Sequence, residues 1–539
     1  MHKRPIFAVL LSLTAMLPTL ARAAEEKTPK NDKPAVMLRF ASLDHLRGDF
    51  RYLAEVIGEG EKAKQLDEII KSKLGEKGLE GIDAKKPIGA YGWIGSAGID
   101  SKVVLMVPIA DEKAFLDLLS NTLDVKPEKG KGNVYAMEVE MVHATVYFRF
   151  ANGYAYVTAR DKDVLDKDKL LAPDKVLPAG QIGAVSVLVN IDQIPDNLKE
   201  LALGTIENQV ASLKDHEMPG HTEAQKKLRD AVVDELSGQI KSLFNDGGET
   251  ALRLDLDRKA GDVVLTASVA GKSGSPLASS IRELGQVKSA TASLLHPNAA
   301  FKSELNVRLP EKLRSLVGPA LKDAEKQALA KAKNEDERAL LKTLLDGIMP
   351  TLKAAELDTA LDLQGPNEKG VYTIVGGIKI KDPGELEKSF RKTAGQFPKQ
   401  IQLDAEKANG IAIHRINPDE YLKPDARRTL GDNPLYIALH GDVLLLSGGE
   451  KGLGALKEAL AATPTTGRVW GLQIALPRVA PMFEDPVQAE IARKAVFGDN
   501  KESGRVRLSV EGGKALTLRF VLDAKVIDYL NRVSKAKKQ

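Results

Sequence analysis

The sequence predicts an α+β fold made of tandemly duplicated antiparallel sheets with helices packed on one face. Apolar and charged residues alternate in strand-like segments such as 252–256, which is typical of a sheet with one covered face. A helical segment, 228–243, carries apolar residues at spacings of three and four, so an amphipathic helix is the natural cover. A hairpin recurs at matching places, at Asn152-Gly153 and at His440-Gly441.

Four segments share one pattern, in which an alternating apolar strand is followed by a turn and a helix start. Each leads through helical sequence to a strand pair and a closing helix. The pattern begins at Val36–Phe40, Val185–Val189, Leu305–Val307 and Leu472–Leu476.

The extra hairpins lie between the first and second copies and between the third and fourth copies. This order divides the chain into a first α+β half, residues 35–288, and a second α+β half, residues 289–539. We expect the halves to superpose, with the two hairpins in one structural position. We also expect the strands at Leu252–Leu256 and Leu361–Leu363 to share a position.

Two hairpins, one with Asn-Gly and one with His-Gly-Asp, lie between strand–helix–strand–strand units. Each is followed by a strand and a short helix, and this arrangement is similar to that of a known class of proteins. The chain resembles large exported bacterial proteins of unknown function that have repeated α+β units. The resemblance covers most of residues 24–539 and implies export and a repeated fold. It transfers no active site.

Residues 1–23 have the three parts of a secretory signal peptide. Lys3 and Arg4 form a basic start, an apolar run extends from Ile6 to Leu20, and Ala21-Arg22-Ala23 places small residues at the cleavage site. The rival interpretation is a membrane anchor, but the run is shorter than the roughly 20 residues that span a bilayer. We expect cleavage after Ala23, a polar linker at 24–34, and a periplasmic or secreted protein with no transmembrane segment in the mature chain.

The composition excludes several classes of protein. The chain has no cysteine, so it cannot carry a disulfide, a catalytic thiol or a cysteine-ligated metal. Its 78 basic and 74 acidic residues are interspersed, whereas a nucleic-acid-binding protein usually concentrates positive charge on one face. The two tryptophans also argue against a carbohydrate-binding surface. We expect no nucleic-acid partner.

Histidine and glycine motifs do not indicate a catalytic site. His216 and His221 are five residues apart with Pro219-Gly220 between them, so one helix cannot direct both to a zinc ion. We expect His143 and His440 to be exposed strand residues. The segments 271–275 and 92–98 match neither a nucleophile elbow nor a nucleotide-binding loop.

Paired carboxylates are the remaining candidate chemistry. Asp255 and Asp257 share a strand face, as do Asp358 and Asp362. A glycosidase needs two carboxyl groups roughly 5–10 Å apart, which neighbouring positions on almost any strand satisfy. We therefore expect these acids to lie on a solvated polar face.

The sequence accordingly predicts no catalytic, cofactor-binding or metal-binding residue and no cofactor. The favoured function is an exported, non-catalytic binding or scaffold protein of the bacterial envelope, with another envelope protein or an apolar ligand as its partner. Two alternatives stay open. One is a carrier that holds an apolar ligand between a sheet and its helices, and the other is a hydrolase without a recognisable motif. A continuous apolar pocket would favour the carrier, a polar cleft with clustered Asp, Glu or His would favour the hydrolase, and the absence of both would favour the scaffold.

Overall fold

The computed structural model describes most of the chain from residue 33 onwards. Its ranges are 33–61, 63–65, 68, 79–96, 100–123, 125–139, 144–159, 161–215, 221–332, 335–417, 424–463, 465–482, 486–500 and 502–536. The expected signal peptide and most of the expected linker lie outside these residues, as do His143, His216 and Gly98.

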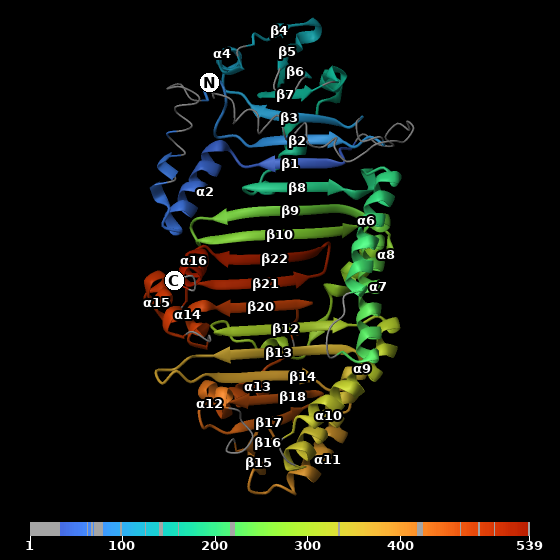
Figure 1. Ribbon diagram of the computed structural model, residues 1–539, viewed down its shortest axis with the longest axis vertical. Coiled ribbons are helices and arrows are strands. Elements are labelled where there is room, and N and C mark those ends of the chain that lie inside the picture. Colours follow the sequence, from blue (N-terminus) through green and yellow to red (C-terminus); the bar gives the residue numbers. More distant parts are fainter. Residues whose placement is uncertain are drawn as a thin grey trace. The chain divides into compact units, whose positions relative to one another are not determined.

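The chain folds into two compact units (Figure 1). The first unit consists of the residues up to Gly204 together with Ser242–Leu277, and the second of Thr205–Lys241 together with the residues from Ala278 onwards. The boundaries therefore fall within helices α6, α7 and α8, whose bounds are given below.

The first unit contains an antiparallel sheet in the order β10-β9-β8-β1-β2-β3-β7-β6-β5-β4. The strands are β1 (Val36–Phe40), β2 (Ile88–Trp93), β3 (Lys102–Pro108), β4 (Glu128–Lys129), β5 (Tyr135–Val139), β6 (Ala144–Ala151), β7 (Tyr154–Ala159), β8 (Val185–Asn190), β9 (Gly247–Asp257) and β10 (Asp262–Gly271).

The second unit contains an antiparallel sheet in the order β22-β21-β20-β12-β13-β14-β18-β17-β16-β15. The strands are β12 (Phe301–Arg308), β13 (Glu356–Gln364), β14 (Thr373–Lys379), β15 (Ile401–Ala408), β16 (Ile411–Ile416), β17 (Leu435–His440), β18 (Val443–Gly448), β20 (Trp470–Ala475), β21 (Arg505–Glu511) and β22 (Leu516–Asp523). The short strands β11 (Lys288–Ser289) and β19 (Thr465–Thr466) pair separately.

The helices lie between these strands in the order that the sequence predicts. They are α2 (Leu43–Val56), α4 (Glu112–Leu123), α5 (Pro173–Val176), α6 (Asp196–Asp215), α7 (Glu223–Asp246), α8 (Pro276–Leu284), α9 (Glu311–Ala330), α10 (Glu335–Ala354), α11 (Pro383–Ala394), α12 (Pro424–Leu430), α13 (Gly452–Ala461), α14 (Leu476–Val479), α15 (Pro486–Phe497) and α16 (Lys525–Ala536). The predicted α+β class with antiparallel sheets is confirmed.

The strand orders of the two units correspond strand by strand. β3 and β14 have seven residues each, β7 and β18 six each, and β8 and β20 six each. The hairpin at Asn152-Gly153 joins β6 to β7, and the hairpin at His440-Gly441 joins β17 to β18. β7 pairs with β3, and β18 pairs with β14, so both hairpins occupy the same place in their sheets.

One expected equivalence is wrong. Leu252–Leu256 belong to β9, which corresponds to β21, whereas Leu361–Leu363 belong to β13, which corresponds to β2. β9 and β13 are each the second strand of a strand–helix–strand–strand unit. The sequence pattern recognised that unit but not its place in the half.

The sequence pattern also missed strands. β15 and β16 form a hairpin around Asn409-Gly410, and both turn residues have positive φ, as an Asn-Gly hairpin turn requires. β4 and β5 extend the first sheet in the corresponding place. β4 has only two residues and β5 reads Tyr-Ala-Met-Glu-Val, so the pattern was weak there, whereas β15 alternates over Ile401–Glu406 and was overlooked.

Helices pack against both faces of the sheets. Leu456 and Leu460 of α13 pack with Val375 and Leu445 on one face of the second sheet. Residues of α14, α15 and α16 form a different hydrophobic cluster, which includes Leu363 on β13. The apolar stripe of α7, which the sequence predicts to face the sheet, is partly exposed. Val232 and Leu236 reach solvent, whereas Ala231 is buried.

Candidate functional site

The second sheet has an uncovered row of mostly apolar side chains. The residues lie directly opposite one another on seven adjacent strands, because each is the register partner of the next. None of them is buried. This first row consists of Leu446, Gly376, Leu361, Ser303, Leu472, Leu508 and Phe520.

A second row runs parallel to the first, two residues along each strand and therefore on the same face. Its members are also register partners, and none is buried. Trp470 at its centre is 39% exposed. The second row consists of Leu444, Ile378, Thr359, Leu305, Trp470, Val510 and Leu518.

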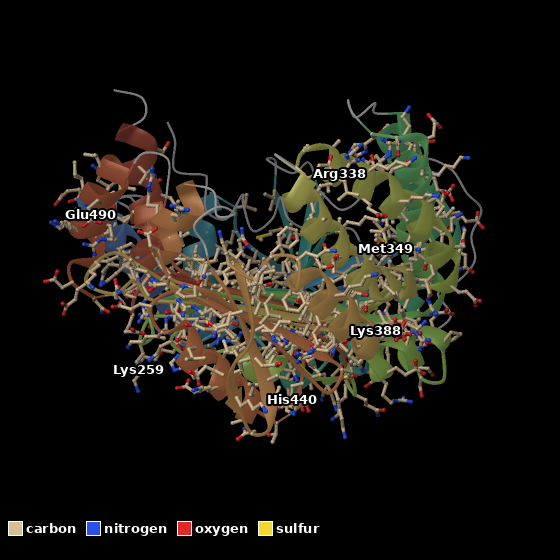
Figure 2. The ribbon with its side chains drawn as sticks, turned by 90° about the horizontal axis from the view of Figure 1, so that it is seen from below. Lys259, Arg338, Met349, Lys388, His440 and Glu490 are labelled. Atoms are coloured by element: carbon tan, nitrogen blue, oxygen red, sulfur yellow. The ribbon has the colours of Figure 1, made fainter. Side chains whose placement is uncertain are left out.

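Helices cover the next position along the same face. Leu363 on β13 packs with Val479 of α14, Phe497 of α15 and Tyr529 of α16, together with the half-buried Phe301 and Ile474. The rows are therefore the part of the apolar face that these helices leave open. Figure 2 shows Glu490 of α15 at the left and Met349 of α10 at the right, with helices rising on the same side of the second sheet at both places.

The two rows carry no ionisable side chain. Ser303 and Thr359 supply the hydroxyl groups, and the remaining members are aliphatic, aromatic or glycine. A contiguous exposed apolar surface is uncommon on a soluble protein and marks a place where a ligand, a membrane or another protein binds. The chemistry of this face is burial of apolar surface, because no group in the rows can transfer a proton.

The other face of the second sheet contradicts one prediction. Asp358 and Asp362 are 8% and 0% exposed, so the expectation that solvent surrounds them is wrong. Residues 288–296 fold over this side of β13 and supply donors. Asp358 accepts hydrogen bonds from Ser289 Oγ at 2.6 Å, Ala290 N at 2.6 Å and Thr291 Oγ1 at 2.8 Å.

Asp362 is less well satisfied than Asp358. Its Oδ2 accepts a hydrogen bond from the backbone N–H of His296, while Oδ1 has no hydrogen-bond partner among the described residues. Burial raises the pKa of Asp362 to about 6, although the His296 N–H opposes that shift. The sequence could not reveal the burial of Asp362, because an aspartate on an alternating strand gives the same sequence pattern whether or not a loop covers it.

The other paired acids agree with the prediction. Asp255 forms an ion pair with Arg253 at 2.6 Å and keeps partial exposure. Asp257 is exposed and accepts hydrogen bonds from the backbone N–H groups of Lys259 and Ala260 at 3.0 Å each, which stabilises the turn between β9 and β10. Neither arrangement resembles a catalytic pair.

The described histidines differ in their exposure. His221 and His440 are exposed, as the prediction for His440 requires. His414 is buried on β16, where its Nδ1 accepts a hydrogen bond from Asp404 N at 3.1 Å and burial lowers its pKa. Within the described ranges, no three histidine or acidic side chains form a group that could hold a metal ion.

Comparisons with known proteins identify no family and no related structure for this chain. No protein-family model matches the chain, and no curated protein and no solved structure shows significant similarity to it. In the part of the chain that the structure describes, no helix is long and apolar enough to cross a bilayer.

Proposed function

We propose that this protein is an exported, non-catalytic binding protein whose second unit holds an apolar chain, such as the acyl chain of a lipid, along the two open rows. The observation that carries the proposal is the continuity of the rows, in which seven strands each present an unburied position in register. Burial of apolar surface would supply the binding free energy, at about 25 cal/mol for each Å² removed from water.

The dimensions of the rows suit an elongated ligand. Seven strands spaced by about 4.8 Å give a row about 29 Å long. One leaflet of a bilayer accounts for about half of a hydrocarbon core about 30 Å thick, so a row exceeds the length of one acyl chain. An apolar chain could therefore contact several strands at once.

The chemistry of the rows favours an acyl chain over a protein segment. Protein interfaces combine an apolar centre with hydrogen bonds, roughly one for each 100–200 Å². Here the hydroxyl groups of Ser303 and Thr359 and the indole N–H of Trp470 are the polar side-chain groups of fourteen row positions. A ligand without polar groups along its length suits such a surface, because it brings no donor or acceptor of its own that would be left unsatisfied.

Two further features belong to this proposal. The matching strand orders support an internal duplication, with the halves at 35–288 and 289–539 built on one plan. The basic start, apolar run and small residues of 1–23 support export with cleavage after Ala23, which would bring the protein into contact with envelope lipids.

Tryptophan fluorescence tests the proposal, because Trp470 lies in the second row and the chain has only one other tryptophan, Trp93. Trp93→Phe leaves Trp470 as the sole reporter. A fatty acid brominated along its acyl chain should quench this variant saturably, because bromine quenches indole fluorescence at contact. The unbrominated fatty acid should not quench.

The matched control is Trp470→Phe, which leaves Trp93 beside Tyr91 in the first unit, with ring centroids 5.4 Å apart. That variant should show no saturable quenching. Equal quenching of the two variants, or none in either, would count against binding along the rows.

A further inference from the structure

A glycine interrupts the first open row of the second sheet. Gly376 on β14 lies opposite Leu446 on β18 and Leu361 on β13, and the two leucines are 36% and 37% exposed. Along β14, Ile374 and Ile378 flank the glycine on the same face, and neither is buried. Four large aliphatic side chains therefore surround a position that has none. We call this hollow the Gly376 notch.

No group of the described residues fills the notch. A Cβ at Gly376 would meet Leu361 Cδ1 at 3.4 Å and the carbonyl oxygen of Ala360 at 3.7 Å, which are ordinary contact distances. Beyond the chain neighbours of the glycine, no other described atom lies within 4 Å of that point. Gly377 differs, because a Cβ there would lie 2.5 Å from Leu294 Cδ1. Close packing therefore explains the glycine at 377 but not the one at 376.

Backbone geometry does not explain Gly376 either. Glycine inside a strand lowers stability, and it usually marks a bulge, a bend, or a place where a ligand or another backbone segment approaches closely. Gly376 does not have a positive φ, and β14 pairs with β13 and β18 without a register shift. Close approach of a ligand is the remaining reason for a glycine at this position.

The first row is closed on one side of the notch. The register partner of Leu446 on β17 is Ile437, which is buried and packs with Phe390 and Ala394 of α11. On the other side of the notch the row stays open as far as Phe520 on β22. An elongated ligand that ends at the notch can therefore extend along the row in one direction only.

The polar side chains beyond the closed end are already paired. His414 on β16 is the register partner of Ile437 and is buried. Its Nδ1 accepts a hydrogen bond from Asp404 N, and its Nε2 lies 3.4 Å from Glu387 Oε1. Arg391 of α11 forms ion pairs with both Glu387 and Asp404. None of these groups is available to receive the carboxylate of a ligand.

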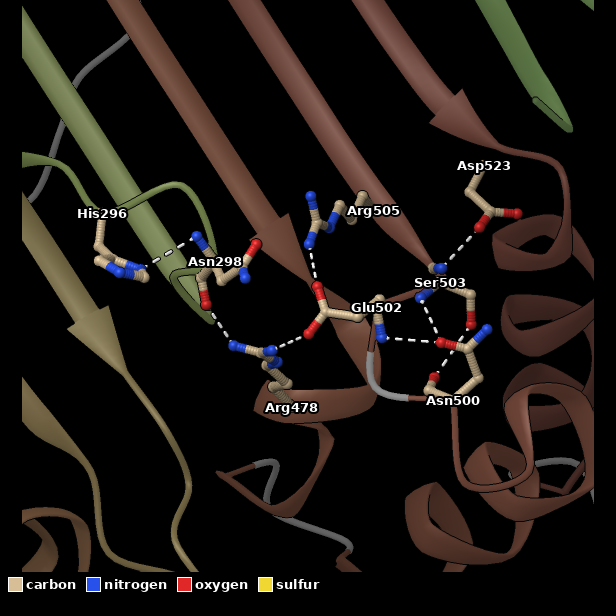
Figure 3. A network of polar contacts seen from close by, with 9 residues as sticks. His296, Asn298, Arg478, Asn500, Glu502, Ser503, Arg505 and Asp523 are labelled. Atoms are coloured by element: carbon tan, nitrogen blue, oxygen red, sulfur yellow. Dashed lines mark hydrogen bonds and ion pairs between the residues drawn. The ribbon is translucent and has the colours of Figure 1, made fainter.

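The arginines around α14 are paired as well. Figure 3 shows Arg478 of α14 and Arg505 of β21 both bound to Glu502, and Arg478 also donates to the carbonyl of Asn298. Because these cations are neutralised, apolar contact rather than a charged head group decides how a ligand lies along the row.

We propose that the Gly376 notch receives the methyl end of the bound acyl chain, so that the chain runs from β14 toward β22 and its head group points away from α11. This inference rests on the function proposed above. The reverse direction would place the carboxylate against the apolar side chains of α11 without a partner, which costs free energy. The ligand class is then a single-chain lipid that binds tail first and leaves its head group in solvent.

The position of bromine on the fatty acid tests the direction of the chain. In the protein with Trp93→Phe and Trp470→Phe, Leu361→Trp places an indole beside the notch. A fatty acid brominated at its methyl end should quench this reporter several-fold more than one brominated beside its carboxyl group. Trp470 lies three strands away from β14, and in the Trp93→Phe variant the methyl-end bromine should lose that advantage. Equal quenching of the Leu361→Trp reporter by the two fatty acids, or stronger quenching by the carboxyl-end bromine, would overturn the proposal.

Gly376→Leu tests the notch itself and should fold, because Leu105 occupies the corresponding place in the first unit. It should weaken binding of a long-chain fatty acid roughly tenfold, the loss expected when about two methylene groups can no longer be buried. Ser303→Leu is the matched control, since it adds the same side chain to the same row outside the notch, where the first unit has Leu38. This control should tighten binding, because it adds apolar surface.

The failure of the notch can be told apart from the failure of the proposed function. Unchanged binding by Gly376→Leu, or equal weakening by Gly376→Leu and Ser303→Leu, would overturn the notch while binding by the unmodified protein stands. If the unmodified protein binds no fatty acid, the function proposed above is wrong and the notch falls with it.

Discussion

The two units share a strand order but differ in what covers their apolar faces. In the first unit, Phe115 and Leu119 of α4 are buried together with Ala90 on β2 and Leu105 on β3. In the second unit, Phe390 and Ala394 of α11 instead pack with Ile401 on β15. The corresponding positions on β13 and β14, Leu361 and Gly376, remain open.

A single position accounts for part of this difference. Leu105 in the first unit corresponds to Gly376 in the second, because each lies opposite the row residue of the preceding strand. Leu105 gives α4 a side chain to pack against, whereas Gly376 gives α11 none. One strand plan therefore produces a row that α4 covers at Ala90 and Leu105 in the first unit, and a row that stays open at Leu361 and Gly376 in the second.

The opposite faces differ as well. On the face opposite the open rows, the second unit has the register partners Asp362, Lys302, Gln473 and Arg507. The first unit has Tyr91, Met37, Leu188 and Ala251 at the corresponding positions. At the adjacent position the sign of a buried charge is reversed, since Arg39 corresponds to Glu304. Arg39 donates from Nε to the carbonyl of Val176 at 2.6 Å, whereas Glu304 pairs with Arg468. Both faces thus indicate that the second unit has specialised surfaces.

Truncation of a leucine should have the largest effect where the face is closed. Leu105→Ala should lower the free energy of unfolding by roughly 2–5 kcal/mol, because it opens a cavity in a packed cluster. Leu361→Ala should cost about 1 kcal/mol or less, because Leu361 already reaches solvent. Denaturant unfolding of both variants measures the difference. Equal losses would mean that the two faces are covered alike.

The buried Asp362 should make stability depend on pH. Its pKa is raised from 3.8 to about 6 in the folded protein, so the folded state binds the proton more tightly than the unfolded state. Protonation of Asp362 therefore contributes to the stability of the folded state below about pH 4, and this contribution is lost as pH rises through about 6. The loss in the free energy of unfolding amounts to about 3 kcal/mol above pH 7.

Asp362→Asn should remove this pH dependence and should be more stable than the unmodified protein at pH 7.5. Thermal unfolding between pH 4 and 8 would show it. Asp358→Asn serves as the contrasting variant, because it disturbs three hydrogen bonds and should destabilise the protein throughout that range. A pH profile unchanged by Asp362→Asn would show that this carboxyl group does not titrate as described.

Much of the fold could be predicted because its strands alternate and its turns carry Asn-Gly or Gly-Asp. The hairpin at Asn152-Gly153 is an example, since both residues have positive φ in the structure. The site could not be predicted in this way. The alternation of Leu361 and Asp362 shows that two faces exist, but covering helices and loops decide that the leucine is open and the aspartate buried.

The most direct test of the central claim compares the affinity for a fluorescent fatty acid of two variants at corresponding positions. Leu508→Asp introduces a charge into the continuous first row of the second unit. Leu252→Asp introduces one at the corresponding, exposed position of the first unit, where α4 interrupts the row at Ala90 and Leu105. We expect Leu508→Asp to weaken binding by roughly tenfold or more, because the carboxylate would have to be desolvated, and Leu252→Asp to leave the affinity unchanged. Unchanged binding by Leu508→Asp, or an equal loss in both variants, would contradict the assignment of the ligand to the second unit.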